Sequence, residues 1–545
     1  MRKSVISIIN HSVFILLAAT LISGFASAQS ADQTPAQSPP HQHHHTNPTK
    51  PKPDAQPQAE PQPEPDTNHA HHHADAAGSM MSTVTGGPFR SMNALGSGTA
   101  LQPASTPVSG WHFMPGEWMV MLHGELKIGY NHQGGPRGVG KAESQNWLML
   151  MAERNLGRGR LMLRGMVTAE PLTTPHGGFP QLFQTGETYR RIPIVDAQHP
   201  HDLVMELAAS YTIPISEKIS FQLYGGPVGE PALGPVAFMH RASAMENPSV
   251  PLGHHWQDSS HITHGVVTGA LTVGRFRFEG SGFHGREPDE NRAAIELGRI
   301  DSYSFRVGFL PTPNWAMQFS YGHLDTPEAL TTSDVIRHTA SITWNRPLRS
   351  GNIASALVWG RNSEVHGVSN SYLLESTVNF LRKNHAYFRG ELLDKQGLYE
   401  DNIFGRLGLV CVRVKPPKPL EAAGQVSDPS IINIGTPPGT IVCQPGNPAT
   451  TTPTAVAYTG PIVTHPDPPP STPTRAYPRE VYNRWFRVGA FTVGGVRDLI
   501  ANDKLRVGIG ADVTFYHQPS VLDPIYGRGT KSYQVFLRFR PGEMK

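Results

Sequence analysis

The sequence is poor in cysteine, in charge and in long apolar runs, and each shortage excludes a class of protein. Two cysteines among 545 residues, Cys411 and Cys443, are too few for a disulfide-stabilised scaffold. Charged residues make up only 16% and the formal net charge is +3, so no strong basic field indicates a nucleic-acid partner. Beyond residue 28, no run approaches the ~20 consecutive apolar residues of a transmembrane helix. A soluble protein, a lipid-anchored protein and a membrane β-barrel remain.

The first 28 residues have the three parts of a secretory signal peptide. Arg2 and Lys3 give a positive start, residues 13–21 (VFILLAATL) an apolar core, and residues 26–28 (ASA) a small-residue cleavage site. No cysteine follows that site, which argues against a lipid anchor. We therefore expect an exported mature chain.

Residues 29–110 are expected to form a disordered, periplasmic tail. Its first part is rich in proline, glutamine and acidic residues and carries HQHHH at 41–45 and HAHHH at 69–73, followed by Met80 and Met81. Imidazole suits copper, zinc and nickel, and thioether favours Cu(I). The tail is thus either a loose collector of metal or a solvated spacer.

From residue 111 onward, apolar and polar residues alternate with the period of β-strands. In LRVGIGADVTFY (505–516), for example, apolar side chains alternate with Arg506, Asp512 and Thr514. Full charges lie on the polar face, and aromatic residues lie near the ends of the apolar face. Trp118 and Tyr130 are twelve residues apart, which in a tilted strand corresponds to roughly 30 Å across a bilayer.

Sixteen strands are predicted, with 14 or 18 as alternatives. They lie near residues 117–130, 143–154, 159–169, 203–213, 217–225, 261–273, 275–286, 301–310, 314–323, 335–345, 352–362, 371–381, 384–394, 483–497, 504–516 and 531–539. Short connections alternate with longer ones along the whole series. Such alternation of short and long connections is typical of an all-β, antiparallel, up-and-down transmembrane β-barrel, with short turns in the periplasm and long loops outside. Residues 111–545 are therefore assigned to an outer-membrane barrel.

The largest predicted outer loop covers residues 395–482 and contains both cysteines. A bridge between Cys411 and Cys443 would stabilise this loop by ~3–4 kcal/mol in the chain-entropy model. Two unpaired thiols are the alternative. A second loop begins with the glycine-rich stretch at 224–235, which lacks the Lys-Ser/Thr of a phosphate-binding loop and is interpreted as folding inward.

Histidines gather in the long connections, at the outer rim or mouth of the predicted barrel. The candidate metal ligands are His199, His201, Asp202, His254, His255, Asp258, His261 and His264. Their spacing can chelate a metal ion, although no HExxH motif is present. Two other interpretations are open. Ser259 or Ser260 could act with His261 or His264 in a hydrolase, without a GxSxG motif. Alternatively, these side chains pack the loops and line a constriction.

Several longer motifs resemble an uncharacterised family of bacterial outer-membrane β-barrel proteins. They include YNHQGGPRG (130–138), DAQHPHDLVMELAA (196–209), GREPDENR (285–292) and the segment 229–267, within a resemblance that covers about residues 97–540. Members often carry Met/His-rich N-terminal segments, which implies a connection with heavy-metal handling. In tail composition the chain is weakly similar to copper-resistance outer-membrane proteins, whose barrel motifs are not evident here.

The resulting expectation is a porin-like barrel that passes or binds small solutes or ions, with a link to copper or zinc handling. Its expected partners are outer-membrane lipid and small solutes or metal ions, and no nucleic acid. No cofactor is required, with copper and zinc as the candidate ions, and no enzymatic activity is expected. A non-conducting, metal-sequestering barrel is the first alternative, and an outer-membrane lipid hydrolase is the weakest.

Overall fold

The computed structural model describes residues 94–174, 177–189, 192–329, 333–365, 367–398 and 485–542, and the backbone of residues 409–413 and 441–445. The predicted signal peptide and both histidine motifs of the tail lie outside the described residues. Within the described part of the chain, no helix is long and apolar enough to cross a bilayer.

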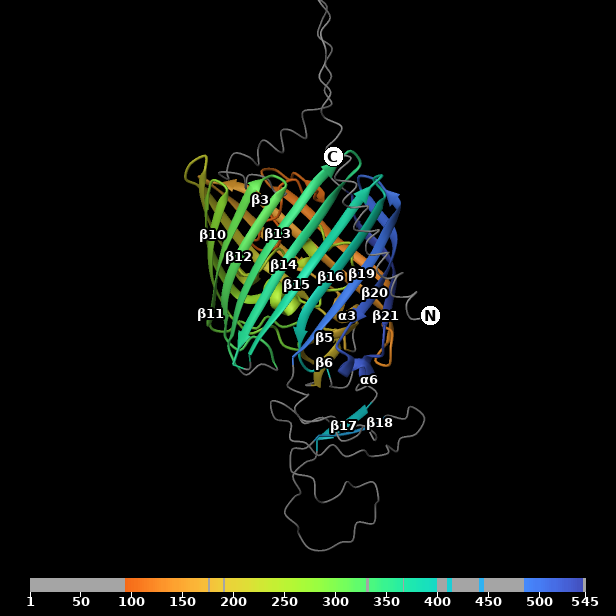
Figure 1. Ribbon diagram of the computed structural model, residues 1–545. Helices are drawn as coiled ribbons and strands as arrows, with labels where there is room; N and C mark the ends of the chain where they lie inside the picture. Colours follow the sequence, from red (N-terminus) through yellow and green to blue (C-terminus); the bar gives the residue numbers. More distant parts are fainter. Residues whose placement is uncertain are drawn as a thin grey trace, which may run out of the picture. The chain divides into compact units, whose positions relative to one another are not determined.

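Sixteen antiparallel strands pair into one closed barrel (Figure 1). The ring closes where β2 pairs with β21. The barrel strands are β2 (Met119–His132), β3 (Gly140–Leu156), β4 (Gly159–Val167), β7 (Val204–Pro214), β8 (Ile219–Gly229), β9 (Thr263–Val273), β10 (Phe276–Phe283), β11 (Ser302–Thr312), β12 (Trp315–Leu324), β13 (Val335–Leu348), β14 (Gly351–Glu364), β15 (Gly367–Phe380), β16 (Asn384–Lys395), β19 (Phe486–Ala501), β20 (Leu505–His517) and β21 (Lys531–Pro541). The predicted fold class and the count of sixteen are confirmed.

The first and last strands of the described chain meet at the seam of the ring. β21 pairs with the second half of β2, from Leu126 to His132. A short strand, β1 (Trp111–Phe113), pairs with the first half of β2, from Val120 to Leu122. The amide of Gly110 donates to the carbonyl of Gly542 at 3.2 Å, so β1 follows on from β21. Together the two strands complete the pairing of β2.

The two faces of the wall have opposite chemistry. On β21, Tyr533, Val535 and Leu537 point outward and are 42–48% exposed, whereas Gln534 and Arg538 point inward and are at most 5% exposed. The other barrel strands repeat this pattern, with large apolar side chains outside and ionised ones inside. A soluble barrel would place its apolar face inward. The predicted alternation is therefore confirmed. Its apolar face points outward and its charged face inward, which suits a barrel surrounded by lipid.

Connections at one end of the barrel are two to four residues long, as predicted. At the other end they are longer, with one exception: β14 and β15 form a tight hairpin in which Glu364 pairs with Gly367. Eight residues were expected there. The polar stretch NSEVHGVSNS resembled a loop, but β14 and β15 continue through it because strands can extend beyond the apolar band. We refer to the two ends as the turn end and the loop end.

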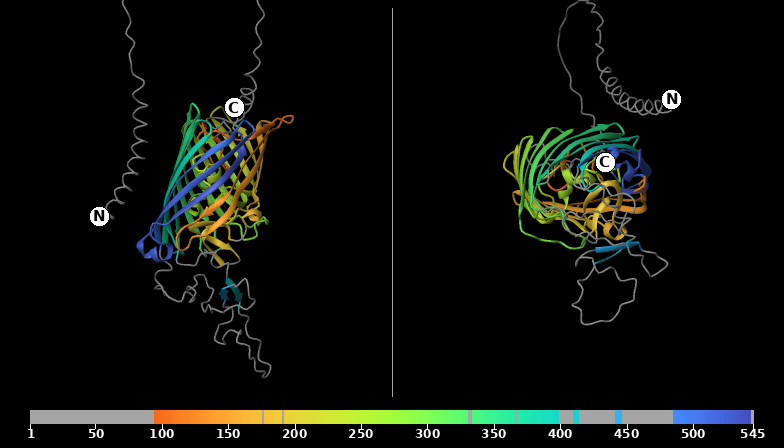
Figure 2. Two further views of the ribbon diagram at one scale, coloured as in Figure 1. Left: turned by 90° about the vertical axis from the view of Figure 1, so that its right-hand side faces the viewer. Right: turned by 60° about the horizontal axis from the view of Figure 1, so that its bottom comes forward.

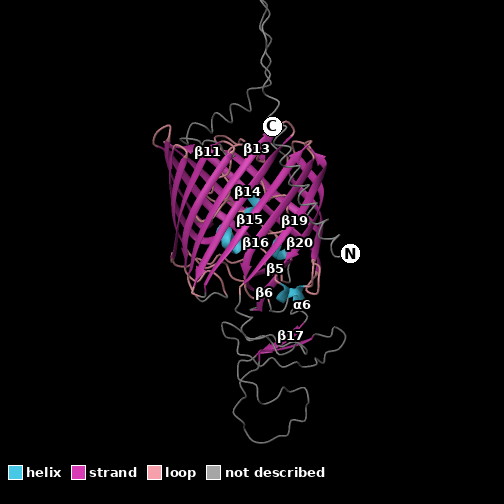
Figure 3. Ribbon diagram, viewed as in Figure 1, coloured by secondary structure: helices cyan, strands magenta, loops and turns pink. Residues whose placement is uncertain are grey.

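The longer connections contain further short elements (Figure 3). β5 (Phe179–Tyr189) and β6 (Ile192–Gln198) form a separate hairpin, as do β17 (Leu409–Arg413) and β18 (Ile441–Pro445). The helical turns are α3 (Glu170–Thr173), η3 (Phe238–His240), α4 (His254–Gln257), η4 (Ser259–His261), η6 (Ser520–Leu522) and α6 (Asp523–Tyr526). Cys411 of β17 lies opposite Cys443 of β18 in register, and their side chains are outside the described part.

Candidate functional site

The lumen is occupied by the chain itself, as an oblique view through the ring of strands shows (Figure 2). The main occupant is the connection between β8 and β9, residues 230–262, here called the plug. The amide of Gly234 donates to Ser320 Oγ of β12 at 3.0 Å, and the carbonyl of Met245 accepts from Lys127 Nζ of β2 at 2.6 Å. Because β12 and β2 are eight strands apart in a ring of sixteen, the plug spans the lumen. The prediction that the glycine-rich stretch folds inward agrees with this course.

An ion-pair cluster ties the middle of the plug to the wall. Arg241 Nε donates to Glu375 Oε1 of β15 at 2.5 Å, and Arg241 Nη1 donates to Asp258 Oδ2 at 3.2 Å. Glu375 also accepts from Arg389 Nε of β16 at 3.1 Å. All four side chains are at most 3% exposed. Charges removed from water to this degree are stable only while they remain paired.

A second cluster holds the plug through Glu246. Its carboxylate pairs with Arg538, with Arg540 at 2.8 Å and with His385 Nδ1 at 3.2 Å. His385 Nε2 in turn lies 3.1 Å from Asp498 Oδ2. The inward-facing charged side chains of β16, β19 and β21 therefore hold the plug in place instead of lining an open lumen.

Residues 94–109, here called the entry segment, also lie inside the barrel, although the sequence placed them in the tail. The amide of Ala237 in the plug donates to Ser97 Oγ at 2.7 Å, and Arg306 Nη2 donates to Thr99 Oγ1 at 2.9 Å. A Cβ atom at Gly98 would lie 2.6 Å from Glu230 Cβ, so only glycine permits this approach. The segment has no helical or strand period, which explains why its pattern resembled a tail.

Four cavities run along the inner wall from the turn end to the loop end. The first, about 620 Å³, lies at the turn end beside Arg382, Lys383 and Arg506. The next, about 80 Å³, shares Pro107 with it. A third, about 40 Å³, shares Glu125 with the second, and a fourth of about 20 Å³ shares His201 with the third. The smallest has room for about one or two water molecules.

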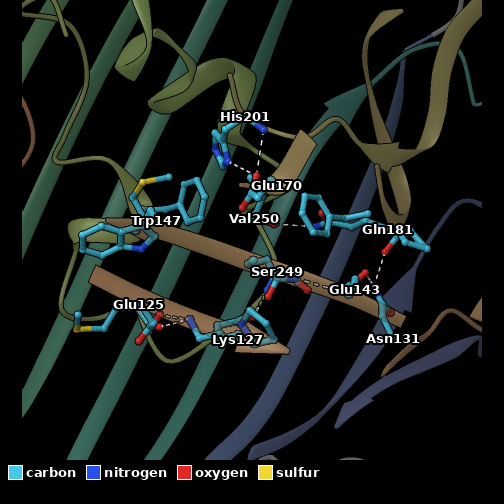
Figure 4. Close-up of a pocket in the computed structure, with 18 residues that line it drawn as sticks. Glu125, Lys127, Asn131, Glu143, Trp147, Glu170, Gln181, His201, Ser249 and Val250 are labelled. Atoms are coloured by element: carbon cyan, nitrogen blue, oxygen red, sulfur yellow. Dashed lines mark hydrogen bonds and ion pairs between the residues drawn. The ribbon is translucent and has the colours of Figure 1, made fainter. Parts of the chain in front are cut away.

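The third cavity lies between the wall and the plug (Figure 4). Lys127 pairs with Glu125 on β2, and Asn131 Nδ2 donates to Glu143 Oε2 of β3 at 3.1 Å. At the side towards the loop end, His201 Nδ1 lies 2.7 Å from Glu170 Oε2. The lining is therefore polar and charged on the wall, and the plug covers it with residues such as Ser249 and Val250.

The predicted histidines lie mostly together at the fourth cavity. The ring centroids of His201 and His261 are 5.3 Å apart, those of His254 and His261 are 5.1 Å apart, and His199 and His255 continue the group at 6.4 Å. His264, on β9, stands apart and accepts from the amide of Glu296 at 3.0 Å. The stretch that contains them is folded into the mouth, since Trp256 Nε1 donates to Ser369 Oγ of β15 at 2.7 Å.

Burial lowers the pKa of most of these imidazoles, although at His255 it is outweighed by Glu328, which raises the pKa there. Burial lowers the pKa of His254 to about 4 despite the hydrogen bond to Asp258, and it lowers the pKa of His261 well below its ordinary value. Burial also raises the pKa of Asp202 to about 6 and outweighs the opposite effect of Arg292, whose Nη1 is 3.1 Å away. Both predicted carboxylate ligands, Asp202 and Asp258, are thus engaged by arginines.

A different trio in the described part of the chain brings its donor atoms closest together. One donor atom each of His255, Glu287 and Glu328 lies within 4.8 Å of the others. Burial raises the pKa of Glu287 to about 8, with Glu328 adding to the effect. His255 was predicted from the sequence, whereas the two glutamates come from other loops. The alternation of short and long connections places those loops at the same end of the barrel, and for Glu328 this was the only signal.

The serines do not form a nucleophile–base pair with the nearby histidines. Ser259 Oγ accepts from Arg337 Nη1 at 2.9 Å. The Nδ1 atom of His261 bonds the carbonyl of Asp258 at 2.8 Å. Among the described residues, Ser260 Oγ is buried without a hydrogen-bond partner. The geometry gives neither serine a base.

No protein-family profile matches the chain, and no curated protein is similar to it in sequence. Solved structures similar to it are outer-membrane proteins. Salmonella typhi OmpF in complex with daunomycin is 8% identical with a TM-score of 0.43, covering 79% of this chain and 100% of that one. An anion-selective porin from Comamonas acidovorans is 9% identical with a TM-score of 0.38, covering 78% and 99%. OmpT of Vibrio cholerae is 7% identical with a TM-score of 0.37, covering 79% and 100%.

Proposed function

We propose that the chain is a bacterial outer-membrane protein of the porin type, which passes small solutes or ions through a lumen narrowed by the plug. The observation that carries this proposal is the inverted wall, apolar outside and ionic inside, in a ring without a free sheet edge. In hydrocarbon, only a closed barrel can satisfy every backbone group of a sheet. The turn end would then face the periplasm, together with the tail.

The cavities support a narrow path rather than a wide pore. They succeed one another along the wall, but the two nearest the loop end have volumes of only about 40 and 20 Å³. A solute larger than a few water molecules would have to displace part of the plug. We therefore propose small ions or solutes as the cargo, without chemistry performed on them.

Planar-bilayer recording of the purified protein tests this proposal. We expect small, discrete conductance steps, well below those of an open barrel of sixteen strands, because the plug leaves only narrow spaces. If membranes that contain the folded, inserted protein carry no current at any voltage, the proposed passage of ions and small solutes is contradicted.

A non-conducting, metal-binding role is the second candidate, and the convergence of His255, Glu287 and Glu328 favours it. Imidazole with two carboxylates is a donor set that suits zinc. In calorimetry, we expect the wild-type protein to bind one more Zn(II) per chain than the double variant Glu287→Gln/Glu328→Gln. The variant Glu364→Gln is the matched control, because Glu364 lies near Glu328 but outside the trio. Equal stoichiometry in wild type and double variant would exclude this site.

A further inference from the structure

Methionine is concentrated on one side of the lumen. Seven of the 16 methionines belong to a single buried cluster. They are Met121, Met149, Met151, Met162, Met166, Met205 and Met239. Six of them come from the neighbouring strands β2, β3, β4 and β7, and Met239 comes from the plug. Such a patch faces inward, away from lipid, so burial in hydrocarbon does not explain it.

Part of this cluster surrounds the second cavity, the chamber of about 80 Å³. Met121 of β2 lies directly opposite Met151 of β3, and His123 lies opposite Met149. Side chains paired across neighbouring strands in this way have Cβ atoms only ~4.5–5.5 Å apart. From the other side, the plug adds Met239 and His240 to the lining. Thioether sulfurs and imidazoles therefore meet around one small space.

His123, which lines the chamber, lacks a hydrogen-bond partner at one ring nitrogen in the part of the chain that the structure describes. His123 Nε2 is shielded from solvent and, among the described residues, has no hydrogen-bond partner. His112 of β1 lies opposite Met121, next to the chamber but outside its lining. A buried polar atom without a partner is costly, and an unplaced ligand is one of the few explanations for it.

The aromatic ring beside the chamber and the paired charges in its lining suit an ion of low charge. The ring of Trp147 lies 5.2 Å from His123 and 4.8 Å from His240, between centroids. The two charged side chains that line the chamber are both paired, Glu125 with Lys127 and Arg540 with Glu246, so a bound ion would meet no unpaired charge among them. A hard divalent ion would need several free carboxylates or carbonyls, whereas thioether and imidazole donors select soft ions.

We propose that this chamber binds a soft monovalent metal ion, Cu(I) or Ag(I), through the sulfurs of Met121, Met149 and Met151 and the imidazole of His123. This site is independent of the proposed passage of solutes through the lumen, because binding here does not require the barrel to conduct. If the barrel does conduct, the chamber lies on the row of cavities between the turn end and the loop end.

Methionine is also a common filler of apolar gaps, and leucine substitution separates the two roles. Leucine conserves the volume of methionine and typically costs less than ~1.5 kcal/mol in a core, but it offers no sulfur. The full chain, folded in detergent micelles without oxygen, is titrated with Cu(I) against a chromogenic Cu(I) chelator. We expect the triple variant Met121→Leu/Met149→Leu/Met151→Leu to bind one equivalent at least about tenfold more weakly than wild type.

The matched control is Met162→Leu/Met166→Leu, which changes two methionines of the same cluster that do not line the chamber. It should bind as wild type does, and the tail contributes equally to all three proteins. If the triple variant fails to fold, the single variant Met149→Leu replaces it. Equal affinity in wild type and the chamber variants would overturn the proposal. If the protein binds Cu(I) in the chamber but never conducts, the proposed passage of solutes is overturned and the Cu(I) site stands.

Discussion

Removing the plug converts the barrel into an open channel. The plug begins and ends at neighbouring positions, because Gly229 at the end of β8 pairs with Thr263 at the start of β9. A short turn can therefore replace residues 231–261 without changing the wall. We expect single-channel conductance to rise by about an order of magnitude, since sixteen-stranded barrels enclose an aqueous channel when nothing fills them.

The control for this deletion is a variant that shortens an exposed turn of the wall, residues 215–218 between β7 and β8. It should conduct as the wild-type protein does. If the plug deletion, folded and inserted, conducts no better than wild type, then the entry segment and the β5–β6 hairpin close the lumen by themselves. That outcome would contradict the role assigned to the plug.

The second large effect is expected from Arg241→Met. This change leaves Glu375 and Asp258, both almost fully buried, without one of their cationic partners. Breaking a buried ion pair by removing one member typically costs ~3–5 kcal/mol. The loss should appear as a lower free energy of local opening of the plug, measured by amide hydrogen exchange over residues 236–258, while the barrel strands keep their protection.

The exposed pair of Arg154 and Glu117 provides the matched comparison. Its distance of 2.9 Å is similar, but the two side chains are 31% and 78% exposed. Arg154→Met should therefore change stability by less than ~1 kcal/mol. If Arg241→Met has an equally small effect, the plug is held by its other contacts, above all those of Glu246.

Much of the wall could be predicted from the sequence because its pattern is local. Alternation with a period of two reports which side of a strand faces lipid, and it placed β20 and β21 to within two residues. The tight hairpin of β14 and β15 was missed, since the two strands leave the apolar band and lose the alternation there. Residues beyond the hydrocarbon can be polar on both faces.

The contents of the lumen were predictable only in outline. The histidine stretch was expected at the rim or in the mouth, and the structure places it in the mouth. Which carboxylate pairs with which histidine could not be predicted, because Glu170, Glu287 and Glu328 come from three different connections and those connections have no periodic pattern. The chamber was missed for another reason. Methionine on an inward face resembles ordinary packing, and only the register of β2 and β3 brings Met121, Met149 and Met151 around one space.

The seam between β2 and the pair β21 and β1 has a consequence for biogenesis. β2 and β21, the first and last strands of the ring, are the two that must pair, so the ring cannot close until β21 has been synthesised. The plug contacts both of these strands, through Lys127 of β2 and Arg538 of β21, so a plug that is already in place would help to hold them together. A plug that folds slowly would then delay stable closure of the ring.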